Sequence, residues 1–169
     1  MQKHKVERKQ INSNMCFICG VNNEAGLKIR FYETEGNEVV CEFTPRDIHQ
    51  SYPGRLHGGV ACSVLDELLG RTIQLLEKDA WAVTADLSVK YKKPVPLNVK
   101  LIAKARPLTY RHGLLTAEGE IYLPDGNIAV KATGRFFKQN VEKIIESMDE
   151  EYSSDEMFYI TDEKDPEYI

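Results

Sequence analysis

Hydrophobic and polar residues alternate along several short segments of the chain, which is the period of half-buried β-strands. Residues 26–33 (GLKIRFYE) and residues 38–44 (EVVCEFT) show it clearly, and the EGN turn between them predicts a hairpin. Further alternating segments are predicted as strands at 82–91, 97–106, 112–123 and 128–137. The PDGN sequence between the last two is a strong hairpin signal.

A helical period appears once before residue 140, from about Gly58 to Glu77. The apolar residues that share one side of this helix should cover the sheet; they are Ala61, Val64, Leu65, Leu68 and Leu76. The element order β-β-α-β-β-β-β predicts an α+β fold in which one long helix packs against an antiparallel sheet.

Length and composition indicate one globular domain, with 169 residues, 42% of them hydrophobic and 28% charged. No apolar run is long enough to span a membrane. The N-terminal residues MQKHKVERKQ have no apolar stretch behind their charges, so we expect no signal peptide and a cytoplasmic location. We divide the chain into a flexible basic arm (1–13), a folded domain (14–140) and an acidic tail (141–169) with a short helix at 140–148.

Charge is distributed unevenly along the chain. Residues 142–169 hold 11 acidic and 2 basic residues, a net charge of -9, and the other 15 acidic and 20 basic residues give residues 1–141 a net charge of +5. A mildly basic body suits a ligand that carries phosphate, but the excess is too dilute to indicate nucleic-acid binding.

Two adjacent acids, Asp66 and Glu67, interrupt the apolar run of the predicted helix. Glu67 lies off the apolar side with Arg71 four residues later, which predicts a solvated surface ion pair. Asp66 shares its side of the helix with the small residues Gly59, Cys62, Ser63 and Gly70. A carboxylate in a trough of small side chains leaves room for a ligand or a second subunit, although a purely structural interfacial aspartate would show the same pattern.

The start of the helix adds a second feature. Gly58 and Gly59 should leave free N–H groups at the positive end of the helix dipole. Such groups can hold a carbonyl oxygen that becomes negative during acyl transfer. Together with Asp66 they form a candidate electrophile clamp and base.

The four cysteines, Cys16, Cys19, Cys41 and Cys62, are too few and too scattered for a disulfide scaffold. The CFIC segment resembles half of a zinc site, but no second Cys/His pair has metal-ligand spacing. We therefore expect free thiols in a packed loop and no metal.

The motif HGGVACSVLDE, with an acid nine residues after the histidine, resembles the hotdog-fold acyl-CoA thioesterases of the PaaI-like family. The upstream CFICGVNNEAGLKIRF and the downstream TADLSVKYKKPVP resemble segments of family members, and the likeness covers about residues 15–138. The resemblance implies hydrolysis of the thioester of an acyl-CoA, with no cofactor beyond the coenzyme A of the substrate.

The resemblance also implies roles for individual residues. Asp66 would be the general base or the nucleophile, the Gly58 N–H would bind the oxyanion, and His57 would shape the loop. Where many members carry Asn or Gln six residues before the histidine, this chain has Ser51, preceded by His49 and Gln50, of which Gln50 is the preferred candidate. Thr84 matches a threonine that some members supply from the neighbouring subunit, and strict alternation places it away from its own helix.

The phosphates of coenzyme A require cations. The family often places a basic contact where Lys92 and Lys93 follow the strand 82–91, and Arg106 and Arg111 are further candidates. Solvated turn charges would look the same.

Three other functions stay open: a hotdog module that binds acyl-CoA without cleaving it, a hotdog dehydratase or hydratase, and an interaction protein that acts through its acidic tail. Asp66 argues against the first. The DIH segment (47–49) is only a fragment of the pattern for the second. A lone sheet of this kind leaves edges unpaired, so we expect a homodimer or a homotetramer.

Overall fold

The computed structural model describes residues 3–78, 80–140, 145–146 and 165–169. Within these residues, seven strands form one antiparallel sheet in the order β1-β2-β3-β5-β6-β7-β4. The strands are β1 (Val6–Lys9), β2 (Arg30–Thr34), β3 (Glu38–Phe43), β4 (Trp81–Tyr91), β5 (Leu101–Arg111), β6 (Leu114–Tyr122) and β7 (Ile128–Gln139). The helices are α1 (Gly58–Arg71) and the 3-10 turns η1 (Asp47–His49) and η2 (Thr72–Leu75). This is the hotdog architecture, as the sequence predicts.

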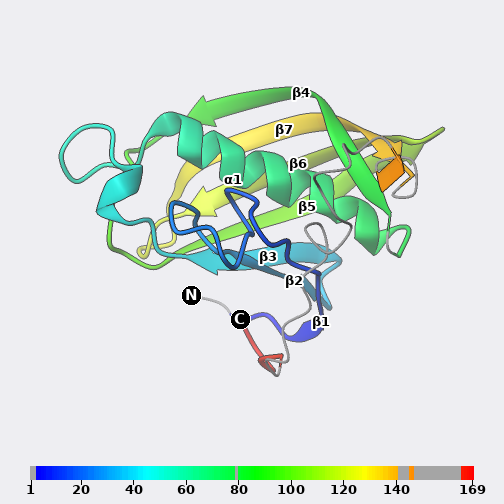
Figure 1. The fold of residues 1–169 in the computed structure, drawn as a ribbon, viewed down its shortest axis with the longest axis horizontal. Helices are drawn as coiled ribbons and strands as arrows, with labels where there is room; N and C mark the ends of the chain where they lie inside the picture. Colours follow the sequence, from blue (N-terminus) through cyan, green and yellow to red (C-terminus); the bar gives the residue numbers. More distant parts are fainter. Residues whose placement is uncertain (1–2, 79, 141–144, 147–164) are drawn as a thin grey trace.

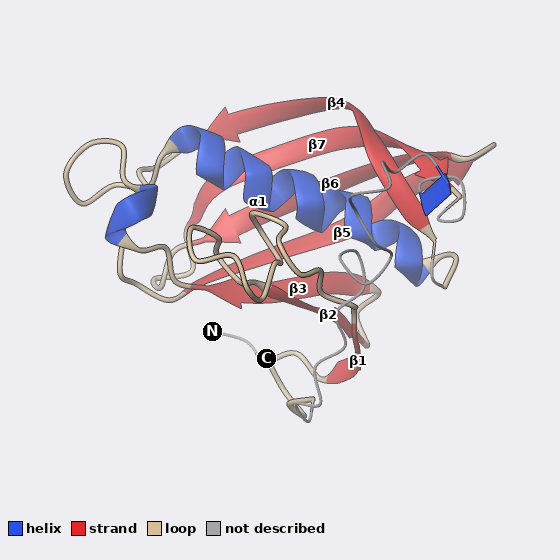
Figure 2. Cartoon of the chain, in the orientation of Figure 1, coloured by secondary structure: helices blue, strands red, loops and turns tan. Residues whose placement is uncertain are grey.

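Helix α1 lies across one face of the sheet, and the loop that follows β1 lies beside it (Figures 1 and 2). The core is formed by the buried side of α1 and the sheet residues that face it. On the helix these residues are Ala61, Val64, Leu65, Leu68 and Leu69, each no more than 1% exposed. Gly119 on β6 permits the close approach, because a Cβ there would lie 2.7 Å from Leu69 Cδ1 and 2.8 Å from the Lys104 carbonyl oxygen.

The expectation of a flexible arm at residues 1–13 is wrong for the part of this segment that the structure describes. β1 pairs with β2, and the side chains of Gln10 and Asn12 are buried. The amide of Asn12 donates to the carbonyl oxygens of Cys19 and Ile29, at 2.6 and 2.8 Å. The polar composition concealed this role, since an edge strand is held by its backbone and these side chains bond to backbone oxygens.

Two predicted boundaries differ from the structure. The helix tightens into a 3-10 turn at Thr72, whose hydroxyl donates to the Leu69 carbonyl oxygen at 2.7 Å. This changes the phase of the side chains, so Leu76, expected in the core, is 43% exposed. β5 begins four positions later than predicted and runs through Pro107, which a bulge between Pro107 and Thr109 accommodates.

β4 is an edge strand that pairs only with β7 within the described sheet. A bulge between Thr84 and Asp86 makes Ala85 an extra residue, since Thr84 pairs with Phe136 and Asp86 with Arg135. A bulge of this kind interrupts the alternation of a strand. Leu87 and Val89 pack against the core beyond the bulge, whereas Ala82 does so before it. The expectation of one alternating set, with Val83 buried, is therefore wrong, and Val83 is 46% exposed.

The C-terminal residues 165–169 lie beside the start of the chain (Figure 1). His4 and Ile169 exchange two backbone hydrogen bonds, with N···O distances of 2.7 and 2.9 Å. The rest of the predicted acidic tail, and most of the helix expected at 140–148, lies outside the described residues. In the described part of the chain, no helix combines the length and the apolar character needed to cross a membrane.

Candidate active site at helix α1

His57 caps the N-terminus of α1. Its Nδ1 accepts the Gly59 N–H at 2.9 Å, and its carbonyl oxygen accepts the N–H groups of Val60 and Ala61. The Gly59 donor is therefore occupied, which corrects the expectation of two free donors. Among the described residues, no acceptor takes the Gly58 N–H. The helix thus offers one donor, Gly58, for an incoming oxygen atom.

Tyr91, at the end of β4, fixes the position of this donor. Its hydroxyl donates to the Gly58 carbonyl oxygen at 2.8 Å, and its ring lies 3.5 Å from the point where a Gly58 Cβ would be. The sequence did not predict this role for Tyr91, because an aromatic residue at a strand end is equally typical of a core position.

Asp66 lies half-buried on α1 and is contacted by β4. The Thr84 hydroxyl donates to Asp66 Oδ1 at 2.7 Å, within the same chain. The expectation that Thr84 points away from its own helix is wrong, because the bulge at Ala85 reverses the facing of residues 81–84 relative to the rest of the strand. The hydrogen bond orients the carboxylate.

A hollow of about 510 Å³ opens beside Asp66 and Thr84. Its wall combines apolar side chains, mostly from β4, β7 and η2, with polar groups from α1 and the N-terminal loop. Members of this wall include Met15, Ile73, Trp81, Ala82 and Phe136. Gly70 does not extend the expected trough of small residues, since Phe136 lies 3.4 Å from the position of a Gly70 Cβ.

A second hollow of about 300 Å³ surrounds Gly58. Lys92 and Lys93, which follow β4, line it together with Ser51, Arg55 and Tyr91. The structure thus brings both predicted lysines to the N-terminus of α1, and Arg55 is a cation that the sequence reading missed. Arg106 and Arg111 line neither hollow, and Arg106 is paired with Glu118 at 2.6 Å.

The three candidates for the second polar role differ in position. The Gln50 side-chain oxygen accepts the Gly54 N–H at 3.0 Å, so it braces its own loop. His49 is buried and bridges the Arg46 N–H and the Ala25 carbonyl oxygen. Ser51 lines the hollow at Gly58 whereas Gln50 does not, which reverses the preference drawn from the sequence.

Glu67 is not the solvated residue that the helical wheel predicts. Its Oε1 accepts hydrogen bonds from the Arg71 guanidinium at 2.8 and 3.0 Å, and the Cys16 thiol donates to its Oε2 at 3.1 Å. Burial acts to raise the pKa of Glu67, but the Arg71 charge and the hydrogen bonds from Cys19, Cys16 and Arg71 together outweigh burial and hold the pKa below its ordinary value. The wheel could not show this, because the N-terminal loop that covers Glu67 is distant in sequence.

The chain resembles known proteins in this region. Residues 53–130 match the model of the thioesterase superfamily. The matched residues include Gly58, Asp66, Thr84 and Lys92, so they form part of the lining of both hollows.

Two acyl-coenzyme A thioesterases have similar sequences over much of the chain. Acyl-coenzyme A thioesterase THEM4 of Bos taurus is 26% identical over 140 residues, which are 82% of this chain and 57% of the relative. Acyl-coenzyme A thioesterase 13 of Homo sapiens is 26% identical over 112 residues, 66% of this chain and 75% of the relative. The chain thus spans less than two thirds of the bovine protein's length.

Solved thioesterase structures share the fold. Protein RHA08564, a thioesterase superfamily protein, superposes with a TM-score of 0.67 at 27% identity, over 72% of this chain and 59% of that one. The BH2602 protein from Bacillus halodurans, solved with CoA, gives a TM-score of 0.54 at 25% identity, over 59% of this chain and 66% of that one.

Proposed function

We propose that this protein hydrolyses the thioester bond of an acyl-coenzyme A, with Asp66 as the general base. The observation that carries the proposal is the hydrogen bond of 2.7 Å from Thr84 to Asp66 Oδ1 beside a largely apolar hollow. It orients a carboxylate where an acyl chain has room. The names of the two relatives, and the CoA in the Bacillus halodurans structure, support an acyl-CoA substrate.

The reaction needs a base, an oxyanion donor and a phosphate contact. Asp66 takes a proton from water as the water oxygen bonds to the thioester carbon. The carbonyl oxygen becomes negative and is held by a Gly58 N–H. When the carbon–sulfur bond breaks, the thiolate of coenzyme A leaves and takes up the proton, and a carboxylic acid remains. Lys92, Lys93 and Arg55 are the cations available for the phosphates of coenzyme A.

Gly58 and Asp66 of one chain cannot act on the same carbonyl group. They are eight residues apart on α1, which corresponds to about 12 Å along the helix axis. They also line separate hollows. We therefore propose that each site combines Asp66 of one copy with Gly58 of another. The exposed edge of β4, which carries Thr84 and leads to Lys92, is the surface across which the two copies would join.

The test is a panel of acyl-CoAs, with release of free thiol as the measurement, applied to the wild type and Asp66→Asn. The variant keeps the size of the side chain but removes the base, so the hydrolysis rate should fall by about 10²–10⁴-fold. It should still bind a non-hydrolysable acyl-CoA analogue. Asp125→Asn, which changes an exposed turn aspartate outside both hollows, is the matched control and should keep the wild-type rate.

Two results would contradict the proposal. If wild-type protein binds acyl-CoA and releases no thiol from any member of the panel, the domain is a binding module. If Asp66→Asn hydrolyses at the wild-type rate, the base is another residue. The panel also identifies the acyl group that the apolar hollow accepts.

A further inference from the structure

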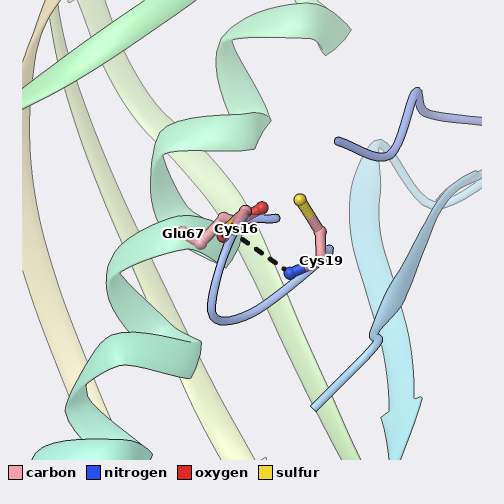
Figure 3. A group of neighbouring side chains, drawn as sticks. All are labelled: Cys16, Cys19 and Glu67. Carbon is pink, nitrogen blue, oxygen red and sulfur yellow. Dashed lines mark hydrogen bonds between the residues drawn. The ribbon is translucent and has the colours of Figure 1, made fainter. Parts of the chain in front are cut away.

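Three metal-ligating side chains converge beside the proposed active site. The sulfur atoms of Cys16 and Cys19 and a carboxylate oxygen of Glu67 all lie within 4.8 Å of one another. Figure 3 shows the two cysteines on the N-terminal loop and Glu67 reaching them from α1. Cys16 and Glu67 are 51 positions apart in the sequence, so only the fold reveals the third ligand.

The loop that carries the cysteines is shaped to hold a thiolate. The backbone N–H groups of Ile18 and Cys19 point at Cys16 Sγ, at 3.3 and 3.5 Å. Such contacts from the following amides stabilise negative charge on sulfur. The turn is closed by the Gly20 N–H, which donates to the Cys16 carbonyl oxygen at 2.8 Å. A Cβ on Gly20 would lie 2.3 Å from that oxygen, so the turn requires glycine.

Arg71 orients the carboxylate and balances the charge. Its guanidinium binds Glu67 Oε1 and leaves Oε2 directed at Cys16 Sγ. Partners of this kind, bonded to the ligand and not to the metal, typically fix the ligand in place. Two thiolates and one carboxylate carry three negative charges. A divalent ion and the Arg71 guanidinium would neutralise them, which suits a site where Arg71 and Cys19 are buried.

We propose that Cys16 Sγ, Cys19 Sγ and Glu67 Oε2 bind one divalent transition-metal ion of the zinc class. Thiolate ligands select zinc over magnesium or calcium, and three protein ligands leave a fourth tetrahedral position. All three residues line the 510 Å³ hollow, so that position opens on the same space as Asp66. The ion would replace the thiol protons that now hold the cluster together. This inference reverses the expectation of no metal and does not depend on the proposed hydrolysis.

The experiment titrates the reduced, chelator-treated full chain with Co²⁺ and then with Zn²⁺, under anaerobic conditions. We expect one Co²⁺ per chain, with a thiolate-to-cobalt charge-transfer band and the intense visible bands of tetrahedral coordination. Zn²⁺ should displace Co²⁺ and abolish both signals. Binding should also release protons, because the thiols must ionise.

Three variants identify the ligands. Cys19→Ser should lose about half of the charge-transfer intensity, since one of two sulfur ligands is removed. Glu67→Gln should keep that band but bind Co²⁺ at least about tenfold more weakly. Cys62→Ser is the matched control. This cysteine lies on α1, the helix that carries Glu67, but outside the cluster, and the variant should titrate like the wild type. Circular dichroism of each metal-free variant distinguishes a lost site from a lost fold.

Three outcomes would overturn the proposal. The first is a wild-type chain, folded by circular dichroism, that shows no charge-transfer band at micromolar Co²⁺. The second is binding that remains unchanged in both Cys19→Ser and Glu67→Gln, which would place the metal elsewhere. The third is a Cys16–Cys19 disulfide in protein isolated anaerobically, which would make the pair a redox couple. None of these outcomes bears on Asp66, so the proposed hydrolysis would stand or fall separately.

Discussion

The hydroxyl of Thr84 donates a hydrogen bond of 2.7 Å to the carboxylate of Asp66 and so joins an edge strand to the central helix. Asp66 is half-buried and Thr84 is exposed. A carboxylate with one oxygen fixed has a defined direction for the other, which is the requirement for a base that positions water.

Thr84→Val removes the donor while keeping the shape of the side chain. A single hydrogen bond to a charged group contributes about 1.5–3 kcal/mol, so we expect kcat to fall by about 10–100-fold. KM should change little, because the acyl chain meets the same surface. Thr84→Ser should restore most of the rate. Steady-state kinetics on the best substrate of the panel measure both variants, and equal rates for Thr84→Val and the wild type would show that the contact is only structural.

Gly58→Pro tests the oxyanion donor without breaking the helix. Gly58 is the first residue of α1, where proline is tolerated, and its predecessor His57 has the extended conformation (φ -63, ψ 133) that a following proline requires. The change deletes the N–H and adds a ring beside Tyr91, and the loss of the donor should lower kcat by about 10²–10³-fold. Gly58→Ala retains the N–H and should stay near the wild-type rate. A fully active proline variant would remove Gly58 from the mechanism.

Mixed oligomers of the two inactive variants test whether the site is shared between copies. A dimer with Asp66→Asn in one chain and Gly58→Pro in the other pairs both intact groups at one of its two sites. Purified through two different tags, it should recover about half of the wild-type activity. A site within one chain predicts no recovery. Light scattering gives the oligomeric state, and a stable monomer that hydrolyses acyl-CoA would contradict the shared site.

The fold should lose stability in acid because of Glu77, whose carboxylate links the segment after η2 to β5 and β7. Tyr110 donates to its Oε1 at 2.5 Å and Lys138 binds its Oε2. The hydrogen bond from Lys138, and then the one from Tyr110, lowers the pKa of Glu77 below its ordinary value. A lowered pKa stabilises the fold above the ordinary pKa, and that stability is lost as the pH falls through the folded value.

Glu77→Gln should therefore reduce stability near neutral pH and make the loss on acidification smaller. Urea unfolding midpoints between about pH 7 and about pH 3 measure this slope. Glu35→Gln, at the exposed pair with Lys5, is the control for a general charge effect. Equal slopes for Glu77→Gln and the wild type would mean that Glu77 is not held in its ionised form by the fold.

The periodic parts of the fold could be predicted from the sequence. Strand alternation and the apolar side of α1 gave the order of elements from β2 to β7, because those patterns arise from burial on one face. β1 was missed because its side chains contribute little to the core and its pairing is made by the backbone. The burial and bonding of Glu67 were not predicted for a related reason: the Cys16 loop that covers it packs there through tertiary contacts.

The residues of the candidate site could likewise be predicted only in part. Gly58 and Asp66 could be found because helix geometry fixes their positions from the sequence. The family resemblance identified Thr84, but the predicted direction of its side chain was wrong, since no local signal in the sequence marks the bulge at Ala85. Tyr91 and Arg55 were not found, because their roles depend on where the strand end and the loop meet the helix.

The extra residue at Ala85 makes the partner of Asp66 a matter of chain length as well as of residue type. Thr84 pairs with Phe136, Asp86 with Arg135 and Leu87 with Gly134, so deleting Ala85 would remove the bulge and leave Thr84 facing α1. A strand that kept Ala85 without the bulge would instead turn Thr84 away from Asp66. When related sequences are aligned to this one, a strand without the extra residue therefore needs a single-residue gap at Ala85. In such a strand, the residue that corresponds to Thr84 lies two positions before the core-facing equivalent of Leu87, and not three.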